Sequence, residues 1–273
     1  MKFIVGARGR LGQALVRQFA SEDVYCLDRA LYQDWAEPGA AERVAQFFAP
    51  WTGSNGTIFV ASGLLDPGMP AAAHASINVD LPRNIMQGAD RCGLAVVSFG
   101  TVMETLQSRP NPYVQSKIAL ANYVADVAAA GAAVAHVRVH TLYGEGEPSP
   151  FMFLGQMLAA LRSGAAFNMT LGKQLREYHH VADEARAIAV LADDGLRGVV
   201  DLSDGAPVTL CALAGAVFRA FDAVPQLRLG AIAEPAEENY SAVFARHPML
   251  PQNHYRPAIP AVVHYLKSLC LTA

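Results

Sequence analysis

Short apolar runs alternate with segments of helical periodicity through the first half of the chain. The runs are continuous rather than alternating, which is typical of strands in a parallel sheet covered by helices on both faces. The predicted strands are residues 2–6, 24–27, 57–61, 94–98 and 133–139, and the predicted helices between them include 11–20, 70–91 and 112–130. Strands that alternate with helices predict right-handed crossovers and a doubly wound α/β fold.

The pattern changes near residue 144. A loop at residues 145–150 has glycine, serine and two prolines, and short helices, short strands and scattered prolines follow it. We therefore expect two regions. Residues 1–144 form the sheet domain, and residues 145–273 form a smaller α+β region, from which some segments return to the sheet.

Composition excludes several classes of protein. The 273 residues are 52% hydrophobic and 16% charged, with a formal net charge of −3, so we expect neither a disordered chain nor a basic surface for nucleic acid. No uninterrupted apolar stretch is long enough to span a membrane. The four cysteines are scattered and form no CxxC pair, which favours a reducing, cytoplasmic location.

A glycine-rich loop follows the first predicted strand and opens the first predicted helix. Glycines allow a tight turn and a close approach to a pyrophosphate, whose charge is stabilised by the helix N-terminus. The alternative is a structural turn that binds no ligand. The predicted dinucleotide contacts in this loop are Gly6, Arg8, Gly9, Arg10, Leu11 and Gly12.

The end of the second predicted strand bears on the choice of dinucleotide. Asp28 can accept hydrogen bonds from both hydroxyls of an adenosine ribose, and it would repel a 2′-phosphate. Arg8 and Arg29 can instead clamp that phosphate, or they lie in solvated loops. The balance slightly favours NAD over NADP.

Tyr113 and Lys117 are four residues apart, so they share one face of the helix that Asn111 and Pro112 are expected to begin. A nearby ammonium favours the phenolate, so we expect Lys117 to lower the pKa of Tyr113. Tyr113 can then exchange a proton with a carbonyl or an alcohol near neutral pH. Lys117 can also hold a nicotinamide ribose.

These motifs resemble the short-chain dehydrogenase/reductase superfamily over nearly the whole chain. The matching residues are Gly6-x-x-Gly9-x-x-Gly12, Asp28, Tyr113-x-x-Ser116-Lys117 and Tyr143-Gly144. The segment from Arg176 to Asp183 resembles that of the extended branch, which comprises nucleotide-sugar epimerases, dehydratases and ketoreductases. The resemblance implies a Rossmann domain, an NAD(P)(H) cofactor, a nucleotide-sugar or other small ketone or alcohol as substrate, and a homodimer.

The resemblance also implies a serine or threonine that binds the reacting oxygen after the fourth strand. When Val102 is aligned with the family's valine, Phe99 stands at that position. Ser98 or Thr101 must then supply the hydroxyl, and we favour Ser98 because it ends the predicted strand. Related dehydratases carry an Asp-Glu pair where this chain has Gly100 and Thr101, which argues against 4,6-dehydration.

The resemblance implies further contacts with cofactor and substrate. Those expected near the cofactor are Ala61, Ser62, Gly63, Thr141 and Leu142. Arg176 would bind the diphosphate of a nucleotide-sugar, or it pairs with Glu177 or Asp183. Phe151 lies in a loop expected to close over substrate. Asn78 stands where the family often has asparagine, or it is a solvated helix residue.

The expected activity is reduction of a 4-keto group on a nucleotide-sugar, with Tyr113 donating the proton. Two alternatives stay open: an epimerase that retains its NAD, and a dinucleotide sensor without catalytic activity, to which the missing hydroxyl at Phe99 gives weight. We expect no metal site at His179 and His180, because no cysteine or carboxylate lies at ligand spacing.

Overall fold

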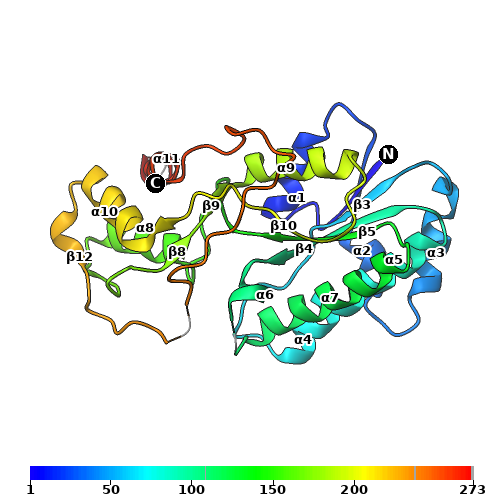
Figure 1. Ribbon diagram of the computed structural model, residues 1–273, viewed down its shortest axis with the longest axis horizontal. Helices are drawn as coiled ribbons and strands as arrows, with labels where there is room; N and C mark the ends of the chain where they lie inside the picture. The colour runs from blue at the N-terminus through cyan, green and yellow to red at the C-terminus, as the bar shows by residue number, and fades with distance from the viewer. Residues whose placement is uncertain (108, 237, 272–273) are drawn as a thin grey trace. The chain divides into compact units, whose positions relative to one another are not determined.

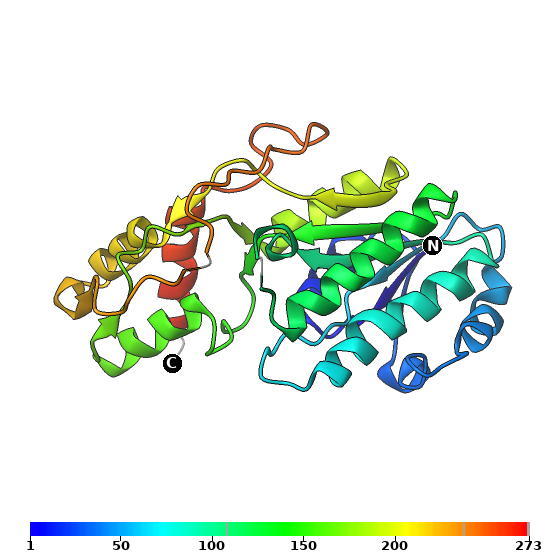
Figure 2. The ribbon, with the colours of Figure 1, turned by 60° about the horizontal axis from the view of Figure 1, so that its bottom comes forward.

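The computed structural model describes residues 1–107, 109–236 and 238–271 (Figures 1 and 2). The chain divides into two compact units. Unit 1 comprises Met1–Val139 and Ala185–Leu202, and unit 2 comprises His140–Glu184 and Ser203–Ala273. Within the described ranges, no helix is both long enough and apolar enough to cross a lipid bilayer.

Unit 1 is built on a six-stranded sheet in the order β10-β5-β4-β3-β1-β2, with every neighbouring pair parallel. The strands are β1 (Lys2–Val5), β2 (Val24–Leu27), β3 (Thr57–Val60), β4 (Ala95–Thr101), β5 (Val134–Val139) and β10 (Gly198–Asp201). The prediction of a doubly wound parallel α/β sheet is confirmed. Strand β10 comes from beyond residue 144 and pairs with β5 at the edge of the sheet.

Helices cover both faces of this sheet (Figures 1 and 2). The helices around the sheet are α1 (Arg10–Gln18), α2 (Arg29–Tyr32), α3 (Ala41–Phe48), α4 (Ala71–Ala75), α5 (Leu81–Asp90), α6 (Met103–Leu106), α7 (Pro112–Ala129) and α9 (Val181–Asp193). A short 3₁₀ turn, η1 (Ala49–Trp51), follows α3. A second 3₁₀ turn, η3 (Val224–Gln226), lies in unit 2. Ile58 and Val96 pack with Leu120 under α7. On the opposite face the Phe59 and Phe19 rings lie 5.1 Å apart. Burial on both faces explains why the strands are apolar throughout.

The predicted helix at residues 70–91 is three consecutive helical segments. Between α4 and α5 lies a π-helical turn, η2 (Ser76–Asp80). Such turns shift the register of the side chains and occur often at functional sites. Here the turn carries Asn78, which is 1% exposed.

Strand β4 is longer than predicted. Its pairing with β5 continues through Thr101, which lies opposite Val139. The expectation that Ser98 ends the strand is therefore wrong, because three more residues of β4 find partners on β5. These residues, Phe99 to Thr101, form the end of the sheet next to α7.

The described part of unit 2 contains two-stranded sheets packed with helices. The strand pairs are β6 (Thr141–Tyr143) with β9 (Tyr178–His180), β8 (Leu175–Arg176) with β11 (Val208–Thr209), and β7 (Phe167–Asn168) with β12 (Leu227–Arg228). The helices are α8 (Phe153–Ser163), α10 (Leu210–Ala220) and α11 (Ala258–Leu271). Their core includes Tyr143, Met157, Phe218 and Leu266, each fully buried.

Candidate active site

The glycine loop turns β1 into α1, and at Gly6 and Gly12 it has no room for a side chain. Gly6 has φ +85°, and a Cβ on it would lie 2.5 Å from the backbone nitrogen of Ser62. A Cβ on Gly12 would overlap the carbonyl oxygen of Gly6. The Gly9 amide donates to that same oxygen at 3.0 Å. The backbone of Gly6 therefore lies directly against the residues that follow β3.

The beginning of α1 fits a pyrophosphate. Gly9 is its N-cap residue and supplies no side-chain cap for the amides of the first turn. Those amides point out of the helix end and favour an anion. The glycines of this loop, followed by an uncapped helix, leave stretches of bare backbone that a phosphate can approach closely.

Asp28 follows β2 and begins α2. One of its carboxylate oxygens accepts a hydrogen bond from the Ala30 amide at 3.0 Å, which caps the short helix. Asp28 and Arg29 are exposed, as is Arg8 in the glycine loop. The charges that bear on the choice between NAD and NADP are therefore open to a ligand.

The loop after β3 is fixed to α7 through Asn78. Its side-chain oxygen accepts from the Leu64 amide at 2.8 Å, and its nitrogen donates to the Leu64 carbonyl and to Ser116 Oγ, both at 3.0 Å. The solvated alternative for Asn78 is wrong. A Cβ added to Gly63 would lie 3.6 Å from Lys117 Nζ, so this loop runs beside the lysine.

Lys117 is buried beneath the end of β4. It is 7% exposed, and its Nζ donates to the Phe99 carbonyl at 2.8 Å. Burial lowers the pKa of Lys117 to about 8, against the opposing influence of the Glu104 charge. Lys117 is therefore still mostly an ammonium at neutral pH, but in a site with little water.

Tyr113 lies one turn before Lys117 on α7, with its ring centroid 6.1 Å from that of His74. Burial, together with the Glu104 charge, raises the pKa of Tyr113 well above its usual value of 10. The expectation that Lys117 lowers this pKa is wrong, because loss of solvation dominates and the charge acting on the phenol is negative. Tyr113 therefore keeps its proton at neutral pH.

The two candidate hydroxyls lie in different surroundings. Ser98 is 1% exposed, and its Oγ lies 3.1 Å from the Ala135 carbonyl and 3.0 Å from His136 Nδ1. Thr101 is half-buried at the end of β4, where its Oγ1 accepts from the Met103 amide at 3.3 Å. The Ser98 hydroxyl is thus bonded inside the sheet, and the Thr101 hydroxyl lies at its end.

A buried carboxylate that the sequence pattern did not predict, Glu104, lies beside Thr101 and Ser98. The Glu104 side chain is fully buried and accepts hydrogen bonds from the Thr101 amide at 2.7 Å and from Arg138 Nε at 2.9 Å. Its Oε1 also lies 3.2 Å from His136 Nε2. The available signal was His136 and Arg138 themselves, since two polar residues at alternate positions mark one face of an otherwise apolar strand.

Arg10 and Leu11 lie in the first turn of α1, and Ala61 directly follows β3; the remaining predicted residues belong to unit 2. Thr141 and Leu142 lie in β6, and the Thr141 amide donates to the Glu177 carbonyl at 3.1 Å. Phe151 is 49% exposed, in the loop before α8. Among the described residues, no group of three or more His, Cys, Asp or Glu side chains could hold a metal ion.

Arg176 pairs with Glu238, a partner that the sequence did not predict. Its guanidinium forms an ion pair with Glu238 and donates to the Leu175 carbonyl at 2.9 Å. Asp183 instead binds Arg256 through two bonds of 2.7 Å. The alternative in which Arg176 pairs with Glu177 or Asp183 is wrong.

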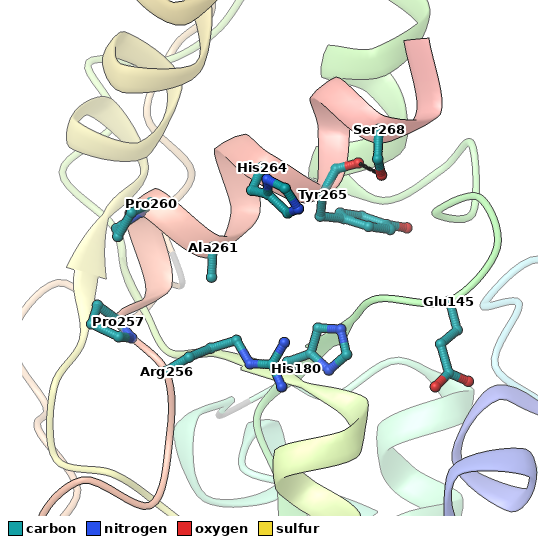
Figure 3. A pocket seen from close by; sticks show the side chains of 9 residues that line it. All are labelled: Glu145, His180, Arg256, Pro257, Pro260, Ala261, His264, Tyr265 and Ser268. Atoms are coloured by element: carbon teal, nitrogen blue, oxygen red, sulfur yellow. Dashed lines mark hydrogen bonds between the residues drawn. The ribbon is translucent and has the colours of Figure 1, made fainter. Parts of the chain in front are cut away.

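A separate pocket of about 530 Å³ opens in unit 2 (Figure 3). Its lining residues are Glu145, His180, Arg256, Pro257, Pro260, Ala261, His264, Tyr265 and Ser268. In Figure 3 the Arg256 guanidinium lies beside the His180 ring, opposite α11. Its lining contains neither Tyr113 nor any other residue in the predicted set, so the predicted catalytic pair lies outside this pocket.

The model of the NAD dependent epimerase/dehydratase family matches residues 3–201, which include the glycine loop, Tyr113 and Lys117. The chain belongs to this family. The predicted relation to the extended short-chain dehydrogenase/reductase branch is therefore confirmed. No curated protein matches the chain by sequence at a significant level.

Solved structures of three related enzymes share the fold. A UDP-N-acetylglucosamine 4-epimerase from Methanobrevibacter ruminantium M1, in complex with UDP-N-acetylmuramic acid, is 12% identical with a TM-score of 0.77, over 100% of this chain and 98% of that one. DesIV, a dTDP-glucose 4,6-dehydratase from Streptomyces venezuelae with NAD and TYD bound, is 19% identical (TM-score 0.73; coverage 98% and 97%). A dTDP-4-dehydrorhamnose reductase from Bacillus anthracis str. Ames, in complex with NADP, is 18% identical (TM-score 0.76; coverage 98% and 98%).

Proposed function

We propose that the protein is an NAD(P)H-dependent reductase that acts on the 4-keto group of a nucleotide-sugar. The observation that supports this proposal is the pairing of Tyr113 and Lys117 on one face of α7, with Lys117 bonded to the Phe99 carbonyl at the end of β4. The family to which the chain belongs supports dinucleotide-dependent chemistry. Neighbours in fold are named for nucleotide-sugar reactions.

The glycine loop and the uncapped start of α1 would hold the pyrophosphate, and Asp28 the adenosine ribose. The other residues proposed to line the dinucleotide are Arg8, Arg10, Leu11, Arg29, Ala61, Ser62, Gly63, Thr141 and Leu142. When bound, the nicotinamide supplies the hydride. NAD(H) is the slightly preferred form, because a carboxylate at Asp28 repels a 2′-phosphate.

Tyr113 would donate the proton to the oxygen of the reacting carbonyl. Its raised pKa suits that role, because the phenol stays protonated at neutral pH. The Lys117 ammonium would stabilise negative charge that develops on the phenolic oxygen. Of the two hydroxyls, we propose Thr101 rather than Ser98 for orienting the carbonyl, because Ser98 Oγ is bonded within the sheet.

Arg176 and Phe151 are the proposed substrate contacts in unit 2. The guanidinium of Arg176 would exchange its ion pair with Glu238 for the diphosphate of the nucleotide, a ligand with the same charge and matching geometry. Phe151 presents an exposed ring on a loop before α8, which suits contact with a base or a sugar.

Binding and turnover test the proposal separately. Nucleotide-stripped protein is titrated with NADH and with NADPH by fluorescence, and oxidation of the preferred form is then followed with UDP- and dTDP-linked 4-keto sugars. Tyr113→Phe should keep the dinucleotide affinity and lose at least about 100-fold in turnover, the contribution of a general acid. Tyr123→Phe, on the same helix and packed under Arg83, is the matched control.

Three results would count against the proposal. Wild-type turnover in Tyr113→Phe would remove the tyrosine from the chemistry. NAD that survives purification, with interconversion of two sugars and no net consumption of dinucleotide, would support the epimerase. Dinucleotide binding without turnover on any keto-sugar of the panel would support the sensor.

A further inference from the structure

Glu104 carries a buried negative charge for which the proposed reaction has no direct use. Its side chain has no exposed surface, and it comes from the short helix α6. Burial alone would raise the pKa of Glu104, but hydrogen bonds from His136, the Thr101 amide and Arg138 bring it below its ordinary value. The carboxylate is therefore ionised at neutral pH.

Gly100 makes room for this charge. A Cβ on Gly100 would overlap both Glu104 Oε1 and His136 Nε2. The side chains of Glu104 and His136 thus occupy the space directly over the backbone of β4, where other residue types would exclude them. The end of the strand is shaped around the carboxylate.

The charges around Glu104 alternate in sign. Arg138 bonds to Glu104 and, at 3.3 Å, to Asp201 on β10. Burial lowers the pKa of His136, so the ring is neutral. An ionised carboxylate only accepts hydrogen bonds, so His136 Nε2 carries the proton and Nδ1 is the unprotonated nitrogen that faces Ser98 Oγ at 3.0 Å.

Glu104 and Lys117 bind the same short stretch of β4. Lys117 donates to the Phe99 carbonyl and Glu104 accepts from the Thr101 amide, two residues along the strand. The Glu104 charge favours the ammonium of Lys117 and disfavours ionisation of Tyr113. From α4, the His74 ring is the other titratable group that faces Tyr113.

We propose that Glu104 is a positioning residue of the active site, whose carboxylate favours the ammonium of Lys117, adds to the effect of burial in holding Tyr113 as a phenol, and fixes the Thr101 end of β4 through the Thr101 amide. This inference rests on the proposed function for its catalytic consequence. The electrostatic part concerns only residues of unit 1, so it can be measured without substrate. Without the charge, the dry surroundings of Lys117 would favour its neutral amine.

Glu104→Gln is the test, because glutamine keeps the shape and an acceptor oxygen but removes the charge. The titration of Lys117 is followed by lysine side-chain NMR, with the signal assigned by its absence in Lys117→Met. The midpoint should fall from about 8 by at least about one pH unit, the scale of an opposite charge at close range. The alkaline limb of the kcat profile for keto-sugar reduction should fall with it.

Two further variants separate charge from structure. Glu104→Asp keeps the charge, so its midpoint should stay closer to that of the wild type than to that of Glu104→Gln. Arg138→Gln removes the positive partner of Glu104 and should move the midpoint upward, the opposite direction. If the cluster around Glu104 acted only through its structure, Glu104→Gln and Arg138→Gln would move the Lys117 midpoint in the same direction.

The Lys117 midpoint in these variants decides whether the Glu104 charge acts on Lys117. A Lys117 midpoint that is equal in the wild type and in Glu104→Gln overturns the proposal. Should Glu104→Gln not fold, Arg138→Gln decides, and a midpoint that does not rise overturns it. A shifted midpoint in a protein without keto-sugar activity would keep the electrostatic role of Glu104 and reject the proposed function.

Discussion

The Lys117→Met variant tests how much stability the folded chain loses because the Lys117 ammonium is buried. The pKa of Lys117 falls from its ordinary 10.5 to about 8 through burial. At 1.36 kcal/mol per pH unit, that depression costs about 3 kcal/mol of the free energy of unfolding at neutral pH. Methionine loses the bond to the Phe99 carbonyl, worth about 1 kcal/mol. We therefore expect the variant to be more stable than the wild type by about 2 kcal/mol at pH 7, although it lacks turnover.

The extra stability of Lys117→Met over the wild type should disappear as the pH rises. Below pH 8 both the folded and the unfolded chain hold the proton on Lys117, so the folded chain bears the full cost. Above pH 8 the folded chain releases this proton, while the unfolded chain keeps it up to 10.5. Between about pH 7 and 9.5 the cost shrinks by about 2 kcal/mol, so the two proteins should become similar in stability.

Urea denaturation at a series of pH values gives this difference directly. Lys173→Met is the matched control, because Lys173 is exposed and its replacement should leave the stability difference nearly independent of pH. A Lys117→Met variant that is less stable than the wild type at pH 7 would refute the reasoning. So would a gain that stays constant up to pH 9.5.

Four other substitutions have expected outcomes. Asp28→Asn keeps an oxygen for the Ala30 amide but removes the charge, so fluorescence titration should show the affinity ratio shifting toward NADPH; an unchanged ratio would contradict the role of the charge. Gly12→Ala places a Cβ on the Gly6 carbonyl and should cost at least about 2 kcal/mol in urea denaturation, whereas Gly9→Ala, with 3.4 Å of space, should cost much less. His179 is 2% exposed, and although burial opposes it, Glu184 and Glu177 raise its pKa to about 9. The stability that His179→Gln removes should therefore be largest below pH 6.5 and should fade as the pH rises through 9, a trend that parallel urea titrations would show or exclude.

The elements with local signals were predicted well. Asn111 does cap α7, since its side chain accepts from the Val114 amide at 3.0 Å, and the continuous apolar runs form the buried parallel strands. The end of β4 was missed because its last residues are ordered by pairing with β5, which only the folded register reveals.

The charged contacts were harder to predict because they join distant segments. Arg176 meets Glu238 across 62 positions of the chain, and Glu104 meets Arg138 across 34. Spacing in the sequence suggests which residues share a helix face, as it did for Tyr113 and Lys117. It does not tell which carboxylate a folded chain brings beside an arginine.

The place of β10 at the edge of the sheet has a consequence for synthesis on the ribosome. β5 is complete at Val139, but the strand that covers its outer edge begins only at Gly198. While the intervening segment is translated, β5 presents unpaired amides and carbonyls on an apolar strand, and such an edge readily joins a strand of another chain. During this period, binding of a chaperone or the rate of translation determines whether β5 pairs with β10 of the same chain or with a strand of a neighbouring chain.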